Sequence, residues 1–184
     1  MRKAVGLLFV ASLLVPVGLV ATSTAGGAAA KAPTCKTLKG TQSYSPALPI
    51  VTSKAVVTSH VTIKSTIGGC SGGPVAGVTG ATSLTKSTYK GNCLSLITHK
   101  GATKGTAVLK WSNGKTSNIT TSLVTTSKAG ASPVLATLTS KFVSGQFVGT
   151  TSVVKIKATP PAGACTKKAL TGYSFVNNGP FTQK

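Results

Sequence analysis

The sequence predicts an all-β protein, an antiparallel β-sandwich of immunoglobulin-like or related topology with about eight strands and two disulfide bonds. Three observations support this fold class. Thr (29 residues) and Ser (20 residues) are abundant and Val is common, a composition typical of strands. Gly or Pro interrupts the chain about every dozen residues, and apolar and polar residues alternate between the interruptions. Helical periodicity is hard to find.

Eight stretches show the alternation expected of strands that have one buried and one solvated face. It is clearest at residues 54–66, where Val57 and Ile63 share one parity and Thr58 and Lys64 share the other. Lysines fall on the polar parity here and in the later stretches, so we expect them to point into solvent. The predicted strands are residues 36–44, 54–66, 78–89, 105–111, 115–126, 134–143, 150–158 and 169–176.

The clearest hairpin is "VLKWSNGKTSNITTSL". A two-residue turn at Asn113-Gly114 would pair odd with even positions and mix the two faces of the strands. A three-residue loop, Ser112-Asn113-Gly114 with Gly114 left-handed, pairs odd with odd positions. It places Trp111 on the same face as Ile119, toward the core. Since a slip of one residue inverts a strand, we predict the three-residue loop.

Residues 1–30 have the three regions of a secretory signal peptide. Met1-Arg2-Lys3 is basic, residues 4–20 are apolar, and a stretch of small residues follows before Lys31. An uncleaved membrane anchor is the alternative, but the apolar run is shorter than the about 20 residues that usually span a bilayer. We therefore expect a single domain over residues 31–184, secreted or associated with the cell envelope, with frayed ends at 26–33 and 177–184.

The four cysteines, an even number in an exported chain, predict two disulfide bonds. Three pairings are open. If strands 36–44 and 54–66 are antiparallel neighbours, Cys35 and Cys70 lie at the same end, which favours Cys35–Cys70 and leaves Cys93–Cys165. Each bond would stabilise the fold by about 2–4 kcal/mol.

The sequence contains no Asp or Glu, against 20 Lys plus Arg. A carboxylate pair for glycoside hydrolysis, the acid of a Ser-His-Asp triad and carboxylate ligands for calcium or magnesium are therefore excluded. The two histidines are isolated and the cysteines lack zinc-ligand spacing, so we expect no metal and no cofactor.

The stretch "GCSGGPV" at residues 69–75 resembles the Gly-Asp-Ser-Gly-Gly-Pro loop of trypsin-like proteases. The resemblance implies a nucleophile at Ser71, but Cys70 stands where the family has aspartate, and no aspartate exists to orient a histidine. His60, the only upstream histidine, falls on the outward parity of its strand. We interpret the stretch as a glycine-rich turn and expect no enzyme, with a serine-lysine hydrolase as the least favoured alternative.

The positive charge indicates an anionic partner. Cleavage after residue 30 would remove Arg2 and Lys3 and leave 18 of the 20 basic side chains on 154 residues. Such a surface attracts polyanions within about 10 Å at 0.1 M salt. Without arginine or an evident aromatic platform, specific nucleic-acid binding is not expected. Anionic envelope polymers or lipids remain as partners, and solubility is the alternative role of the lysines.

Six segments resemble a group of small secreted β-sandwich proteins of actinobacteria: "CKTLKGTQSYSP", "GGCSGG", "NCLSL", "GTAVLKWSNGKTS", "FVSGQFVGT" and "CTKKALTGYSF". The resemblance covers most of residues 35–176 and implies export and a disulfide-containing sandwich. It implies no established activity, and this chain departs from the group in lacking acidic residues. No functional residue is transferred.

These observations predict an exported, non-enzymatic β-sandwich that associates electrostatically with anionic polymers or lipids of the cell envelope. A subunit of an extracellular assembly or an adhesin, recognised through an exposed sheet edge, is the alternative. Contact with the membrane itself is expected only through an uncleaved signal peptide. The sequence leaves the oligomeric state open.

Overall fold

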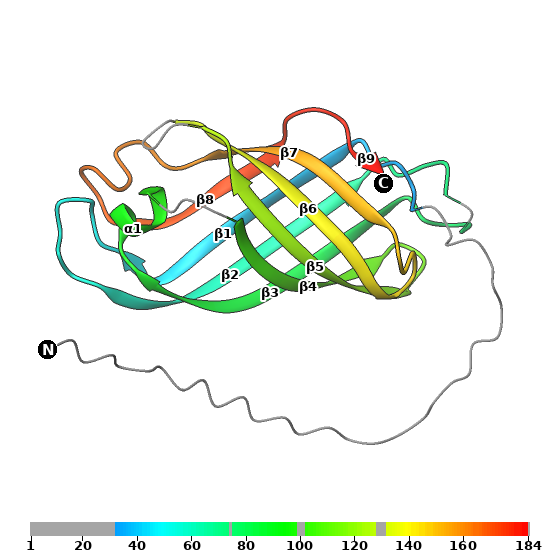
Figure 1. The fold of residues 1–184 in the computed structure, drawn as a ribbon, viewed down its shortest axis with the longest axis horizontal. Coiled ribbons are helices and arrows are strands. Elements are labelled where there is room, and N and C mark those ends of the chain that lie inside the picture. Colours follow the sequence, from blue (N-terminus) through cyan, green and yellow to red (C-terminus); the bar gives the residue numbers. More distant parts are fainter. Residues whose placement is uncertain (1–31, 74, 99–101, 128–131, 184) are drawn as a thin grey trace, which may run out of the picture.

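The computed structural model describes residues 32–73, 75–98, 102–127 and 132–183, and the predicted signal peptide lies outside them. Nine strands and one short helix make up the described fold (Figure 1). All eight predicted strands are confirmed, with ends displaced by a few residues. The elements are β1 (Thr37–Leu48), β2 (Val57–Gly68), β3 (Gly80–Gly91), α1 (Cys93–Thr98), β4 (Ala102–Trp111), β5 (Thr116–Thr125), β6 (Val134–Gly145), β7 (Thr151–Thr159), β8 (Leu170–Asn177) and β9 (Thr182–Gln183).

The strands form one closed antiparallel barrel, so the predicted sandwich is wrong while the all-β class is confirmed. Each of β1 to β8 pairs with its neighbours in the chain, and β8 pairs with β1 to close the sheet. Strands β5 to β7 cross in front of β1 and β2 (Figure 1). A sandwich and a barrel both require one buried and one solvated face on each strand, so alternation alone does not distinguish them.

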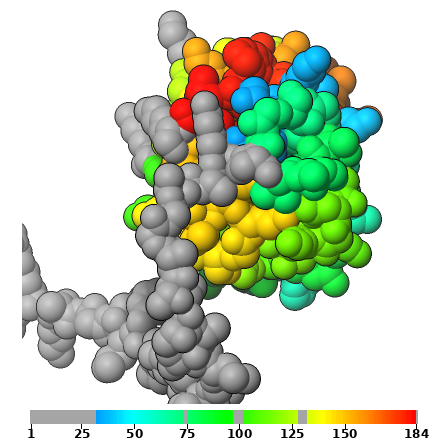
Figure 2. Space-filling view, turned by 90° about the vertical axis from the view of Figure 1, so that its right-hand side faces the viewer, coloured from blue at the N-terminus to red at the C-terminus, as the bar shows by residue number. Residues whose placement is uncertain are grey.

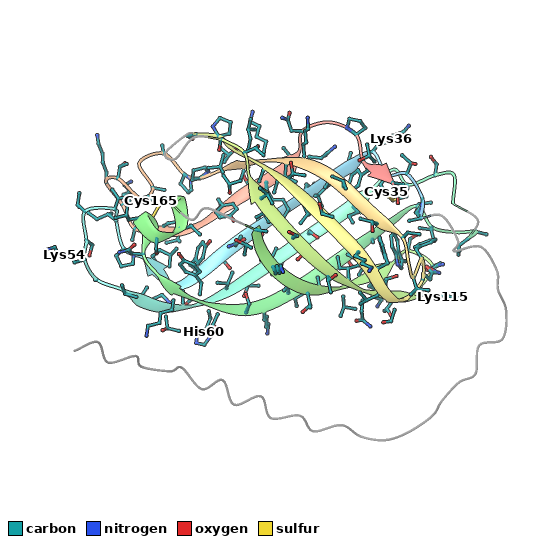
Figure 3. The ribbon with its side chains drawn as sticks, in the orientation of Figure 1. Cys35, Lys36, Lys54, His60, Lys115 and Cys165 are labelled. Atoms are coloured by element: carbon teal, nitrogen blue, oxygen red, sulfur yellow. A yellow bond between two sulfur atoms is a disulfide. The ribbon has the colours of Figure 1, made fainter. Side chains whose placement is uncertain are left out.

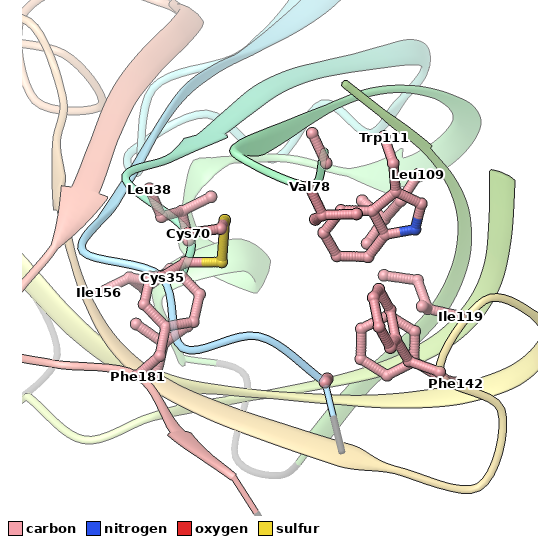
Figure 4. Packing of buried hydrophobic residues seen from close by; sticks show 14 of the residues in the cluster. Cys35, Leu38, Cys70, Val78, Leu109, Trp111, Ile119, Phe142, Ile156 and Phe181 are labelled. Carbon is pink, nitrogen blue, oxygen red and sulfur yellow. A yellow bond between two sulfur atoms is a disulfide. The ribbon is translucent and has the colours of Figure 1, made fainter. Parts of the chain in front are cut away.

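Inward-facing side chains fill the barrel, as expected for eight strands. The larger hydrophobic cluster lies at the end where the Ser112–Gly114 turn connects β4 and β5, and Trp111 and Phe142 stack there with ring centroids 6.1 Å apart (Figure 4). The Trp111 indole N–H donates to the hydroxyl of Ser117 at 2.8 Å. The smaller cluster, which contains Leu48 and Leu170, occupies the other end.

The β4–β5 hairpin has the predicted three-residue loop. Ala107 pairs with Ile119, odd with odd, and the N–H of Gly114 donates to the carbonyl of Trp111 at 2.9 Å. Gly114 has φ of 81°, the left-handed conformation that favours glycine. Trp111 and Ile119 are both buried, so the prediction of their shared face is confirmed.

The prediction of frayed ends is wrong within the described residues. Ala32 is buried, and Phe181 is buried in the larger cluster just before β9, which pairs with β7. The side-chain amide of Gln183 donates to the carbonyl of Pro33 at 3.1 Å, so the two ends of the described chain meet. Figure 2 shows this end of the molecule, where the C-terminal segment lies beside the first strand.

The two disulfide bonds are Cys35–Cys70 and Cys93–Cys165, the pairs that the expected strand arrangement favoured. Figure 3 shows Cys35 and Cys165 at opposite ends of the barrel. Cys35–Cys70 packs within the larger hydrophobic cluster and Cys93–Cys165 within the smaller one. The bonds thus fasten the loops at both barrel ends, and both are consistent with an oxidising compartment.

The helix α1 was not predicted, because six residues are too few to show helical periodicity. It follows β3 and begins at Cys93. Within the described part of the chain, no helix combines the length and the apolar character required to cross a membrane.

Neighbouring strands of the barrel wall differ in how much of their length is paired. Strands β3 and β4 pair only from Ala81 opposite Trp111 to Ser83 opposite Leu109. They then diverge toward the end that carries α1 (Figure 1). We call β3 residues 84–91 and β4 residues 102–108 the open seam. By contrast, β8 and β9 share the edge of β7, so that seam is covered along most of its length.

A candidate anion-binding groove

A shallow groove of about 740 Å³ crosses the outer wall of the barrel over β1 to β4. The register of the four strands determines where the lysines of this groove lie. Lys39 on β1 lies opposite Thr66, Thr66 lies opposite Thr82, and Thr82 lies opposite Lys110 on β4. Since neighbouring strands are about 4.8 Å apart, Lys39 and Lys110 are about 14 Å apart along this row. We call the surface the lysine groove.

A third lysine enters the groove from the next row of residues. Lys64 lies on β2 between Thr41 of β1 and Leu84 of β3. All three lysines are exposed, and the sequence offers no side-chain carboxylate to pair with them. Three ammonium groups with threonine hydroxyls between them can donate hydrogen bonds to an anion that extends over several strands.

The groove continues into a depression of about 420 Å³ over β3 to β6, whose lining combines apolar side chains with Lys86, Asn118 and two threonines. Leu84 and Val108 line both hollows, and Val143 of β6 lines the second. These three side chains are 55%, 49% and 46% exposed. The outer face thus carries Leu84 directly opposite Lys64, and Val108 at the outward position next to Lys110 on β4.

Positive charge is also spread over the rest of the molecule. Every one of the 14 lysines in the described ranges is exposed. Figure 3 shows Lys54 at one end of the barrel and Lys36 and Lys115 at the other. The prediction that strand lysines point outward is confirmed, and the three lysines of the lysine groove belong to this general surface charge.

The interior of the barrel holds a hydrogen-bonded polar cluster. The amide of Gln42 donates to the Tyr44 hydroxyl at 2.6 Å, and the Tyr173 hydroxyl donates to the Gln42 carbonyl at 2.9 Å. Burial, with the nearby Tyr173 as a further cause, raises the pKa of Tyr44. Burial likewise raises the pKa of Tyr173. Both phenols therefore stay protonated and serve the packing of the barrel.

The protease-like stretch lies in a connection beyond the end of β2. Ser71 is exposed, and its N–H and carbonyl each hydrogen-bond to Thr34 at 2.9 Å. His60 lies eight residues before Gly68, the last residue of β2, which corresponds to about 26 Å along the strand. The structure therefore does not bring His60 to Ser71.

Lys36 is the lysine close to this turn, since its side chain lies beside Gly69. It is exposed, whereas a lysine that acts as a base must be desolvated. All four cysteines are in disulfide bonds, so they offer no thiolate ligand for a metal. His99 lies outside the described residues.

The lysine groove was not found from the sequence. Its lysines are at positions 39, 64 and 110 and are far apart in the chain. Their parity predicts that each points outward, but their position in one groove depends on the register of four strands. A one-residue change in any of these registers would separate them.

Comparisons with known proteins give no match. No protein-family model, no curated protein and no solved structure matches the chain.

Proposed function

We propose that this protein is an exported, non-enzymatic β-barrel that associates electrostatically with anionic polymers or lipids of the cell envelope. The lysine groove carries the proposal, because Lys39, Lys64 and Lys110 line one surface with no side-chain carboxylate to neutralise them. The signal-peptide pattern, the two disulfide bonds and the resemblance to exported actinobacterial proteins support the location.

The exposed lysines outside the groove contribute attraction at a distance, and the groove contributes contacts. At 0.1 M salt the attraction extends about 10 Å and weakens as salt is added. A flexible polyanion can place successive charges opposite Lys39, Lys64 and Lys110, whereas a compact anion would reach one or two of them. An extended, repeating anion is therefore the preferred ligand.

Salt-dependent retention of the purified domain on immobilised polyglutamate and on phosphatidylglycerol vesicles tests the proposal. We expect retention at low salt and release as sodium chloride is raised. The variant K39Q/K64Q/K110Q should elute at lower salt than K54Q/K167Q/K168Q, which removes the same charge from surfaces outside the groove. No retention at low salt, or retention that salt leaves unchanged, would refute the electrostatic association. Equal elution of the two variants would refute the role of the groove.

A role as a subunit of an extracellular assembly or as an adhesin is the second candidate function. The open seam favours it, because free strand edges are common sites of recognition between chains. Size measurement of the purified domain at increasing concentration distinguishes self-assembly from a monomer that requires another partner.

A further inference from the structure

The open seam presents strand edges that pair with no other strand of the described part of the barrel. Beyond Ser83 and Leu109, no described residue pairs with β3 residues 84–91 or β4 residues 102–108 along their facing sides. A free edge offers a row of backbone N–H and carbonyl groups to another extended segment. This seam differs from that beside β7, where β9 supplies a covering strand.

The outer rim of the seam is positively charged. Lys86 and Lys90 project outward from β3, and Lys104 projects outward from β4. All three are exposed. The end of the seam nearest Ser83 carries two exposed apolar side chains on its outer side, because Leu84 and Val108 line the depression there together with Lys86. A partner in the seam would thus meet positive charge along its length and an apolar surface at one end.

The inner side of the seam is lined by small or hydroxyl-bearing residues. Ser87, Thr103 and Gly105 lie on the inward parity of their strands, yet all three are exposed. Inward-facing residues elsewhere in the barrel, such as Leu109 and Ile119, are buried. Solvent therefore reaches the inner side of the wall along the middle of this seam, while Gly91 at the end of β3 is buried beside Ser95 of α1.

From these observations we infer that the open seam binds an extended acidic segment of a partner protein, which pairs with the free edge of β3. The inference rests on the assembly role given above as the second candidate function. Charge complementarity selects the partner, since this chain has no acidic residue of its own to place beside Lys86 and Lys90. Backbone pairing supplies affinity, and alternate side chains supply specificity.

The register of β3 gives the partner a definite pattern. The outward positions of β3 are Leu84, Lys86, Thr88 and Lys90. An antiparallel partner, the more stable orientation per residue, therefore presents acidic residues at positions i and i+4 and an apolar residue at i+6. The positions between them face the inner side of the wall. The capped peptide Glu-Thr-Thr-Val-Glu-Val-Leu has this pattern.

Binding of this peptide to the purified domain, followed by amide hydrogen exchange, tests the inference. We expect slower exchange for residues 84–91 and no change for β7 on the opposite side of the barrel. Three control peptides isolate strand pairing from charge. One moves both glutamates to even positions, and the other two carry N-methyl groups, each on one of the two sets of alternate amides. Moving the glutamates should weaken binding by about tenfold, and one of the N-methyl peptides should not bind.

A matched pair of charge-reversal variants tests the rim. K86E/K90E should bind the peptide at least about tenfold more weakly, whereas K155E/K157E on β7, with the same net charge, should retain most of the affinity. These lysines are exposed, and circular dichroism checks that both variants fold. Slower exchange at residues 84–91 together with these preferences supports the inference.

Two outcomes would overturn it. If all acidic peptides bind equally well, charge alone attracts them and strand pairing at the seam is refuted, while salt-sensitive retention on polyglutamate still supports envelope association. If no peptide binds, the seam is not a site for acidic strands. Failure of the domain to be retained on polyglutamate would refute the envelope proposal separately.

Discussion

Gln42 illustrates how single residues determine the interior of this barrel. It uses both ends of its amide group, donating to Tyr44 and accepting from Tyr173. The tyrosines also contact each other, with ring centroids 6.4 Å apart. The network fixes the orientation of Gln42 between the two hydrophobic clusters, where an unpaired amide would be costly.

We expect the substitution Tyr173→Phe to destabilise the protein by about 1–3 kcal/mol, because it leaves the Gln42 carbonyl without its donor inside the barrel. Urea unfolding followed by tryptophan fluorescence measures the change. Tyr89→Phe is the matched control. It removes a hydrogen bond to Ser95 at an exposed site and should cost less than about 1 kcal/mol. A larger loss in the control variant would contradict this account of the cluster.

For single residues, the sequence predicts which face of a strand a side chain lies on better than it predicts which other residues that side chain contacts. The parity rule correctly turns Trp111 inward and Lys64 outward, because successive side chains of a strand alternate between faces. It does not predict that Gln42 meets Tyr173, 131 positions away in the chain. That contact depends on β8 pairing with β1, which no local pattern specifies.

The hairpin between β4 and β5 shows how a turn sets the faces of two strands. The three-residue loop pairs odd with odd positions, and Gly114 supplies the left-handed residue that it requires. A Cβ added at Gly114 would meet no other atom within 4 Å, so backbone conformation is the main cost of substitution.

The substitution Gly114→Ala should therefore cost about 1–2 kcal/mol of stability. Gly114→Asn should cost less, because asparagine tolerates the left-handed region better than alanine does. Equilibrium unfolding of both variants measures the order. If alanine is tolerated as well as asparagine, the conformation of this turn is not limiting.

Secondary-structure elements could be predicted where a local sequence pattern marks them. The eight long strands follow from alternation and from Gly or Pro at their ends. The two-residue β9 is too short to show a period, although Phe181 beside it is an apolar residue in a segment that was expected to fray. The open seam could not be predicted, because it depends on where β3 and β4 cease to pair.

The whole molecule combines one continuous sheet with a surface of one charge sign. Closure gives the sheet no pair of long terminal edges like those of a sandwich, and the open seam is a local interruption in the wall. The sequence did not predict closure of the barrel. In a sheet whose strands follow one another in chain order, the alternation of apolar and polar residues is the same whether or not the first and last strands pair. The Val and Thr pattern therefore gives the fold class but not the architecture.

Charge repulsion should oppose folding of the molecule as a whole, since its side chains carry positive charges and no negative ones. Raising sodium chloride from 10 to 200 mM should increase Tm by about 2–4 °C, which corresponds to about 1 kcal/mol for a domain of this size. Differential scanning calorimetry measures the response. The variant K54E/K167E/K168E, with a lower net charge, should respond less. A flat or falling Tm in the original protein would contradict the prediction.

The meeting of Gln183 with Pro33 has a practical consequence for engineering. Because the two ends of the described chain lie side by side, a short peptide linker between residues 183 and 32 can join them, and the polypeptide can be reopened at the Ser112–Gly114 turn. Such a circular permutant would retain every strand neighbour while moving the free termini to another loop. Fusion partners or surface-attachment tags could then be placed there without disturbing the buried Phe181.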